Sequence, residues 1–199
     1  MTMRILMLLF ACAALSGAAL AQGEKPGEPS HEEMMKVFEE MARPGPEHAM
    51  LGETAGRWNC QVKSWHDPKG DPEVSEGTDE SEAIFGGRYI RSHFKGAMMG
   101  QPYEGLGVMG FDKGKKKFVG TWFDSMGTGI LTYEGDYDAG KKELICRGSY
   151  TNPMTGTEDH CRLVTRFENP DRHVFEFWGP NPEGGGESRW MEITYNRIK

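Results

Sequence analysis

Most of the sequence consists of short runs that alternate between apolar and polar residues and are separated by turn residues. Alternation with a period of two is the pattern of a β-strand whose two faces differ in environment. Ten such runs follow one another along the chain, and they span 57–65, 73–84, 88–95, 102–111, 116–124, 127–135, 143–150, 157–167, 172–178 and 188–198. Hairpin-sized segments rich in Gly, Asn, Asp and Pro divide them, so each strand is predicted to pair antiparallel with the next.

This pattern predicts an all-β fold: an up-and-down antiparallel barrel of about ten strands with an N-terminal helical segment. The runs lie too close together for the helices of βαβ units. An open sheet of this length would leave two unpaired edges, and closure into a barrel removes both. The interior of such a barrel is either filled by side chains or able to hold one small ligand. Residues 44–199 are therefore predicted to form one β-barrel domain.

The first part of the chain has the features of an export signal. Residues 1–21 combine one arginine near the start, an apolar stretch and the small-residue end Ala19-Leu20-Ala21, which is typical of a secretory signal peptide cleaved before Gln22. Lipid attachment at Cys12 is the less favoured alternative, because the apolar stretch before it is short. That stretch is also shorter than the roughly 20 apolar residues of a membrane-spanning helix. The protein is predicted to be exported, periplasmic or secreted, without a transmembrane segment.

Residues 22–43 are predicted to form a flexible arm followed by an amphipathic helix. Ser30 and Glu33 make an S-x-x-E capping box at the start of this helix. Apolar residues then recur at helical spacing along one face, at Met34, Val37, Phe38 and Met41. Helix 31–42 is interpreted either as a lid or strut packed on the domain or as the contact surface for a protein partner.

The charge of the chain argues against two classes of partner. It carries 30 acidic and 23 basic side chains, a formal net charge of −7. Such a surface repels phosphate backbones and anionic lipids, so a nucleic-acid partner is not expected. The 5 Trp, 6 Tyr and 10 Phe residues indicate a folded domain with a large apolar interior.

Three cysteines remain once the signal is removed: Cys60, Cys146 and Cys161. An odd number in an oxidising compartment predicts one disulfide and one spare thiol. In a symmetric hairpin with Tyr150 opposite Thr157, Cys146 falls opposite Cys161, near enough for a disulfide. We therefore expect a Cys146–Cys161 disulfide, with buried free thiols as the alternative.

Two sets of motifs resemble known proteins. Gly56-Arg57-Trp58 on the first strand and Arg197 near the end of the last resemble the calycins, the class of lipocalins and fatty-acid-binding proteins. This resemblance implies that Trp58 closes the floor of the barrel and that Arg197 lies across its ring.

The stretch from Pro44 to Arg197 is also similar, in order, to the bacterial domain-of-unknown-function 1579 family. The matching segments are Pro44-Gly45-Pro46-Glu47-His48, Gly56-Arg57-Trp58, Phe85-Gly86-Gly87-Arg88-Tyr89, Gly105-Leu106-Gly107, Gly110-Phe111-Asp112, Thr121-Trp122-Phe123-Asp124-Ser125-Met126 and Met191-Glu192-Ile193-Thr194-Tyr195-Asn196-Arg197. The resemblance implies a lipocalin-like barrel and brings no established activity with it.

The candidate ligand-binding residues lie on the strands expected to line the barrel. One face of the run 116–124 carries Phe118, Trp122 and Asp124, so an acidic group ends an aromatic wall, and a buried carboxylate needs hydrogen bonds or a counter-charge. The residues predicted to contact a small, mostly apolar ligand are Tyr103, Met109, Phe118, Trp122, Asp124 and Ser125. The alternatives are that Asp124 and Ser125 bond to backbone at a turn, and that the barrel is filled and serves a structural or interaction role.

Gly105 and Gly107 share the face of Tyr103 and Met109. Glycines inside a strand are expected to permit the tight curvature of a small barrel or to leave interior volume for a ligand.

A further candidate site depends on which way one strand faces. Arg91 and His93 share a face of the run 88–95, opposite Ile90 and Phe94, and are interpreted as a solvated outer face. If that face turned inward, Arg91, His93 and Asp124 would hold a small anion or perform acid–base catalysis, which is the enzyme alternative.

No catalytic residue, metal or cofactor is predicted. The six histidines do not fall at H-x-H or H-x-x-x-H spacing. The sequence also contains no G-x-S-x-G nucleophile elbow and no G-x-x-x-x-G-K-[ST] phosphate loop.

Overall fold

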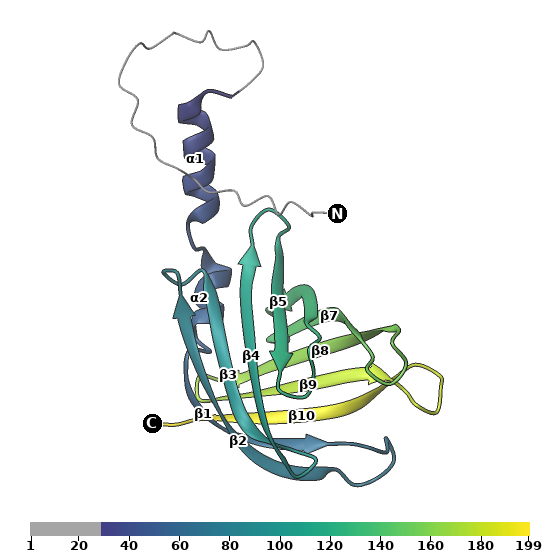
Figure 1. The fold of residues 1–199 in the computed structure, drawn as a ribbon. Helices are drawn as coiled ribbons and strands as arrows, with labels where there is room; N and C mark the ends of the chain where they lie inside the picture. The colour runs from purple at the N-terminus through teal and green to yellow at the C-terminus, as the bar shows by residue number, and fades with distance from the viewer. Residues whose placement is uncertain (1–28) are drawn as a thin grey trace, which may run out of the picture. The chain divides into compact units, whose positions relative to one another are not determined.

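A computed structural model describes residues 29–199 and shows a closed antiparallel barrel (Figure 1). The predicted signal peptide, Cys12 and most of the predicted arm lie outside the described residues. The elements are α1 (His31–Ala42), α2 (Pro46–Gly52), β1 (Gly56–Ser64), β2 (Glu73–Ile84), β3 (Tyr89–Met98), β4 (Gln101–Asp112), β5 (Lys117–Asp124), β6 (Leu131–Asp138), β7 (Glu143–Thr151), β8 (Glu158–Asn169), β9 (Arg172–Pro180) and β10 (Glu187–Arg197). The described residues divide into two units between Val37 and Phe38, and the barrel lies in the second.

Every strand pairs antiparallel with its neighbour in the chain, and β1 pairs with β10 to close the barrel. The predicted up-and-down barrel of ten strands is therefore confirmed. The sixth strand was predicted at 127–135 but begins at Leu131. The alternating segment Ser125–Ile130 is instead exposed and forms the loop between β5 and β6, because it offers glycines where a strand would need side chains to pack.

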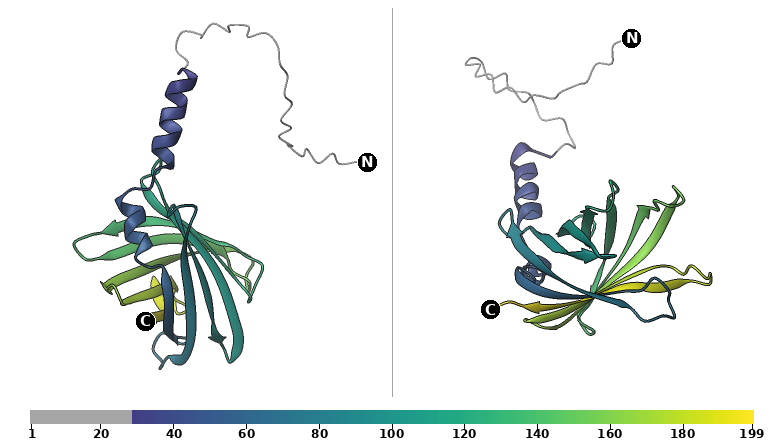
Figure 2. Two further views of the ribbon diagram at one scale, coloured as in Figure 1. Left: turned by 90° about the vertical axis from the view of Figure 1, so that its left-hand side faces the viewer. Right: turned by 60° about the horizontal axis from the view of Figure 1, so that its bottom comes forward.

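The two ends of the barrel differ, and we call them the floor and the mouth. The floor hairpins are short, with loops at 85–88, 113–116, 139–142 and 170–171. The mouth carries the loops 65–72, 99–100, 125–130, 152–157 and 181–186. Figure 2 shows the strands of the barrel from two further directions.

Two floor hairpins use the same sequence, Asp-x-Gly-Lys-Lys, at 112–116 and 138–142. In each, one Asp oxygen accepts from the backbone N–H groups of the Gly and of the Lys that follows it. The second lysine, Lys116 or Lys142, has a positive φ of 56° or 55°. Asp side chains that bind the backbone ahead of them favour tight turns, which explains why this end of the barrel is compact.

The floor is covered by α2 and locked by Arg197. Leu51 of α2 is buried in one cluster with Ile90 and Phe118. Trp58 is 2% exposed, and its Nε1 donates to the Thr54 carbonyl at 2.9 Å. The Arg197 guanidinium lies 4.1 Å from the centroid of the Trp58 ring, which is the arrangement that the calycin resemblance implies.

The predicted cysteine pairing is wrong. The register of β7 and β8 places Cys146 opposite Leu163 and Cys161 opposite Gly148, so the two thiols are offset along the ladder. The offset arises because the turn lies one residue later in the chain than expected. Thr151 pairs with Glu158, so each residue of β7 faces a β8 residue two positions further along than predicted. Cys60, Cys146 and Cys161 are all buried and free.

Candidate functional site

The inner wall of the barrel holds a set of large side chains that are only half-buried. Strand alternation places them on the same face as the buried residues Trp58, Phe94 and Phe118. They include Tyr103, Met109, Trp122, Tyr133, Tyr150, Phe175, Phe177, Met191 and Tyr195. Inward side chains of this size become fully buried when a barrel is packed solid, as they would in any protein interior. Their partial exposure indicates accessible space between the inner walls or at the mouth.

The buried core is divided in a way that fits such a space. One cluster contains Leu51, Phe118 and Leu163, and a second contains Trp58, Phe94 and Ile193. Half-buried Phe175 packs against both. The wall that carries the candidate ligand residues therefore connects two separate packed regions.

At the mouth, three inward side chains from β4 and β5 form one hydrogen-bonded group. Tyr103 Oη donates to Asp124 Oδ2 at 3.0 Å. Trp122 Nε1 lies 3.1 Å from both Asp124 Oδ2 and Tyr103 Oη and donates to them. The backbone N–H of Met126 donates to Asp124 Oδ1 at 2.9 Å. Burial and the neighbouring Asp124 raise the pKa of Tyr103, so its hydroxyl stays protonated and remains a donor.

The indole of Trp122 lies flat against β4, over two glycines. A Cβ atom at Gly105 would overlap the Trp122 ring, and one at Gly107 would lie 2.9 Å from it. These glycines were expected to provide curvature or open volume. They instead give room for the indole, which fixes Trp122 beside Asp124.

The other predicted ligand residues lie apart from this group. Ser125 is exposed, and its Oγ accepts from the backbone N–H of Glu104 at 3.1 Å, so it ends the β4–β5 ladder. Phe118 is 3% exposed and belongs to the core cluster near the floor, where Met109 packs against it. Tyr103, Trp122 and Asp124 are the predicted residues that the structure brings together.

The enzyme alternative required Arg91 and His93 to share a cleft with Asp124, and this expectation is wrong. Both point outward from β3, where the Arg91 guanidinium pairs with Glu82 at 2.8 Å and His93 Nε2 contacts Glu104. Asp124 points inward. The physical reason is parity, because Ile90 and Phe94 occupy the buried face of the same strand.

Sequence reasoning missed a polar group in the interior. Asp79 is 2% exposed and accepts hydrogen bonds from the hydroxyls of Ser81 and Ser92. Burial raises the pKa of Asp79, and the two serine hydroxyls oppose that rise. The alternation of small and acidic residues along β2 was the available signal, since Ser75, Gly77, Asp79 and Ser81 are the less exposed positions of the strand.

Two more inward polar residues were also missed. His173 stacks on Tyr195 with ring centroids 4.3 Å apart, and burial, assisted by Arg197, lowers the pKa of His173 to about 4. Tyr150 Oη is buried and has no hydrogen-bond partner among the residues that the structure describes. A buried hydroxyl normally has a partner, so the Tyr150 hydroxyl is an exception within the described interior.

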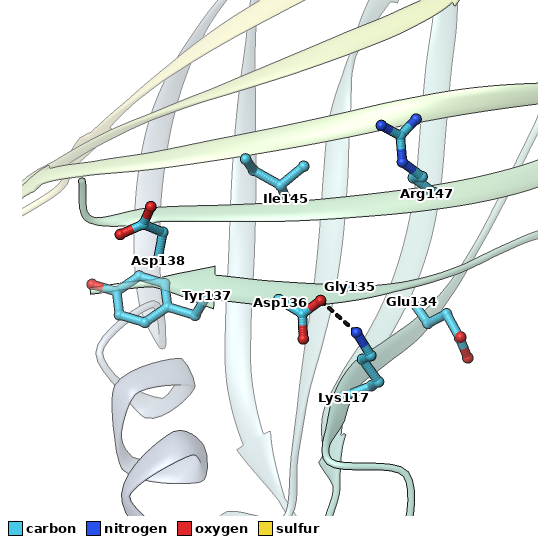
Figure 3. Close-up of a pocket in the computed structure, with 8 residues that line it drawn as sticks. All are labelled: Lys117, Glu134, Gly135, Asp136, Tyr137, Asp138, Ile145 and Arg147. Carbon is cyan, nitrogen blue, oxygen red and sulfur yellow. Dashed lines mark hydrogen bonds and ion pairs between the residues drawn. The ribbon is translucent and has the colours of Figure 1, made fainter. Parts of the chain in front are cut away.

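A depression of about 640 Å³ lies over β5, β6 and β7 (Figure 3). Its lining includes Lys117, Asp136, Glu134 and Arg147, and an ion pair between Lys117 and Asp136 crosses it. Charged, exposed residues dominate this surface. It lacks the apolar lining with a few placed polar groups that is typical of small-molecule sites.

Two negative findings apply to residues 29–199. No group of three or more His, Cys, Asp or Glu side chains in this part of the chain could hold a metal ion. None of the helices described there is long and apolar enough to span a membrane.

Comparison with known proteins places the chain among lipocalin-like barrels. A family described as "Protein of unknown function (DUF1579)" matches residues 43–197. The crystal structure of Rv2717c from M. tuberculosis is similar with a TM-score of 0.60 and 13% identity, covering 79% of this chain and 100% of that one. The S-type phycobiliprotein lyase CPES from Guillardia theta is similar with a TM-score of 0.51 and 13% identity, covering 86% of this chain and 99% of that one. The search of curated proteins finds no match.

Proposed function

Because the chain belongs to the family of proteins of unknown function DUF1579, its activity has to be argued from its own residues, and we propose that it binds one small, mostly apolar molecule inside the barrel. At 13% identity the structural likenesses support the barrel fold alone. The observation that carries the proposal is the half-buried inner wall, with Trp122, Tyr133 and Phe177 among its members.

The energetic reason is the apolar area that this wall leaves uncovered. An aromatic side chain buries roughly 150–250 Å² when fully covered. Each 100 Å² of apolar surface removed from water contributes about 2.5 kcal/mol. A ligand that covered parts of several wall residues would therefore gain binding free energy that the empty barrel does not realise.

The test is the fluorescence of N-phenyl-1-naphthylamine, a neutral apolar probe that brightens in an apolar site. Thr165 is half-buried on the inner face of β8 and lies opposite Phe175, which contacts both core clusters. Thr165→Phe should fill this region and lower the probe's affinity by about tenfold or more. Thr132→Phe makes the same change at an exposed outer position of β6 and serves as the control. Absence of probe binding by the wild-type protein, or equal binding by both variants, would reject the proposal.

A second candidate function is recognition of a protein partner by helix α1. None of its residues is buried, and the apolar stripe Met34, Val37, Phe38 and Met41 is 40–65% exposed. An apolar stripe that stays exposed is typical of an interaction surface. Deletion of residues 22–43 should abolish capture of a partner while the barrel remains folded, and unchanged capture would count against this candidate.

We also propose that the protein acts after export, on the strength of the signal-like segment 1–21. This proposal supports a role in the periplasm or outside the cell, where an apolar molecule needs a carrier to stay in solution. The test is the N-terminal residue of protein recovered from an exporting host, which should be Gln22.

A further inference from the structure

The charges and hydrogen bonds of the inward side chains indicate which ligand charge the barrel accepts. This inference rests on the proposed binding inside the barrel and names the class of molecule. We propose that the barrel takes a small apolar molecule with a protonated amine, that Asp124 holds the ammonium group at the mouth, and that apolar carboxylates are rejected.

The charged side chains that point into the barrel are mostly acidic. Strand alternation turns four carboxylates toward the interior: Glu73 and Asp79 on β2, Asp124 on β5 and Asp159 on β8. In the described wall, residues 56–197, the inward cation is Arg197, and it is committed to the floor. Its guanidinium donates to the carbonyls of Glu53, Ala55 and Pro170 while it covers Trp58.

A carboxylate ligand would therefore meet no available counter-charge on the described inner wall. His173 does not supply one, because it is buried and stays neutral at neutral pH. Outward cations such as Arg91, Arg166 and Arg189 are paired with acidic residues on the outer face. Moving an anion into such a site is costly, since its charge loses water and gains no partner.

The hydrogen bonds at the mouth also favour a donor ligand over an anion. The donors beside Asp124 are the Tyr103 hydroxyl and the Trp122 N–H, and both already point to Asp124 Oδ2. A ligand carboxylate could bind them only by displacing Asp124. Asp124 itself has about four acceptor positions, of which Tyr103, Trp122 and Met126 occupy three. The remaining position, on Oδ1, can accept from an ammonium N–H.

The wall next to Asp124 is aromatic, which also suits a cation. Trp122 and Tyr103 are aromatic, and Phe94 packs edge-on against Tyr103 with ring centroids 5.9 Å apart. Aromatic faces attract cations and also accept apolar chains. A carboxylate set among aromatic rings at the opening of an apolar interior thus fits a molecule with a cationic head and an apolar body.

The experiment uses three ligands of equal chain length: dodecylamine, dodecanol and dodecanoate, each below its micelle concentration. Their displacement of N-phenyl-1-naphthylamine from the full mature chain is measured at neutral pH. We expect dodecylamine to bind at least about tenfold more tightly than dodecanoate, with dodecanol between them, because one charge-assisted hydrogen bond is worth about that factor.

Two variants locate the effect. Asp124→Asn should weaken dodecylamine about tenfold and leave dodecanol unchanged. Glu104→Gln removes the same charge from β4 on the outer face, where Glu104 is exposed, and should leave the order of the three ligands intact. The wild-type ligand series decides the charge preference even if Asp124→Asn does not fold.

The possible results separate this inference from the proposed function. If dodecanol binds and dodecanoate binds as tightly as dodecylamine, the amine preference is overturned while binding inside the barrel still stands. An unchanged dodecylamine affinity in Asp124→Asn would overturn the role of Asp124. Failure of all three ligands to bind, checked directly by calorimetry, would reject both proposals.

Discussion

Arg197 joins the last strand to the floor of the barrel, and its replacement by methionine should cost stability out of proportion to its position near the end of the chain. The guanidinium covers the Trp58 ring at 4.1 Å and donates to Ala55 O at 2.7 Å, Glu53 O at 2.6 Å and Pro170 O at 2.9 Å. These contacts tie β10 to the segment between α2 and β1.

The expected magnitude follows from these contacts. A cation–π contact contributes about 0.5–2 kcal/mol. A hydrogen bond from a charged donor contributes about 1.5–3 kcal/mol when buried. The low ends of these ranges give roughly 5 kcal/mol for one cation–π contact and three hydrogen bonds. The side chain is 23% exposed, so water replaces part of what is lost and the expected value is smaller than this sum. We expect Arg197→Met to lower the free energy of unfolding by about 3 kcal/mol, which corresponds to roughly 6–12 °C in Tm.

The assay is urea unfolding followed by tryptophan fluorescence, with Arg172→Met as the matched control. Arg172 lies on the outer face of β9, is 42% exposed and pairs with Glu168, so its loss should cost less than about 1 kcal/mol. Arg197→Lys keeps the charge and loses the planar fork, so an intermediate loss is expected. Equal stabilities for Arg197→Met and Arg172→Met would refute the assignment of Arg197 as the lock of the floor.

Three further predictions concern titration, thiols and processing. In the folded protein the pKa of His173 is lowered to about 4, against an unfolded value of about 6.5. On acidification the unfolded chain therefore binds this proton first, and the free energy of unfolding should fall by roughly 3 kcal/mol between pH 6.5 and pH 4. His173→Phe should flatten this pH dependence. Burial raises the pKa of Cys60 and Cys146 to about 12 and that of Cys161 to about 11, so a thiol reagent should label none of them in the native protein and all three in urea; labelling of one alone in urea would reveal a disulfide. Protein recovered from an exporting host should begin at Gln22, and an intact Met1 in the periplasmic or secreted fraction would contradict the predicted signal peptide.

Strand number and closure could be predicted because each strand carries its own alternating pattern. Register could not, since it depends on where a turn begins. The turn between β7 and β8 was predicted one residue too early in the chain. This displaces each β8 partner by two residues and places Leu163 rather than Cys161 opposite Cys146. The predicted start of β6 was wrong for a related reason. Residues 125–130 alternate as a strand does, but they form the loop between β5 and β6.

The candidate site was predictable to the extent that it lies within one strand. Trp122 and Asp124 are two residues apart on β5 and therefore had to share a face. The contact with Tyr103 depends on the β4–β5 register, which sets Gly105 opposite Asp124. Asp79 escaped notice because its strand has no large apolar residue on the inward face to mark it, and its partner Ser92 comes from the next strand.

Asp79 and Asp124 are both inward carboxylates, but they differ in burial and in how their acceptor positions are filled. Burial raises the pKa of Asp79, so ionising this group opposes folding, and two serine hydroxyls are retained to limit that cost. Asp124 lies at the mouth, is half-buried, and receives three donors while one acceptor position stays open. Packing alone would be served as well by apolar residues at such positions. Asp124 is held in place by three donors and keeps one acceptor position without a hydrogen bond. A ligand that donates to this position explains the arrangement better than packing does.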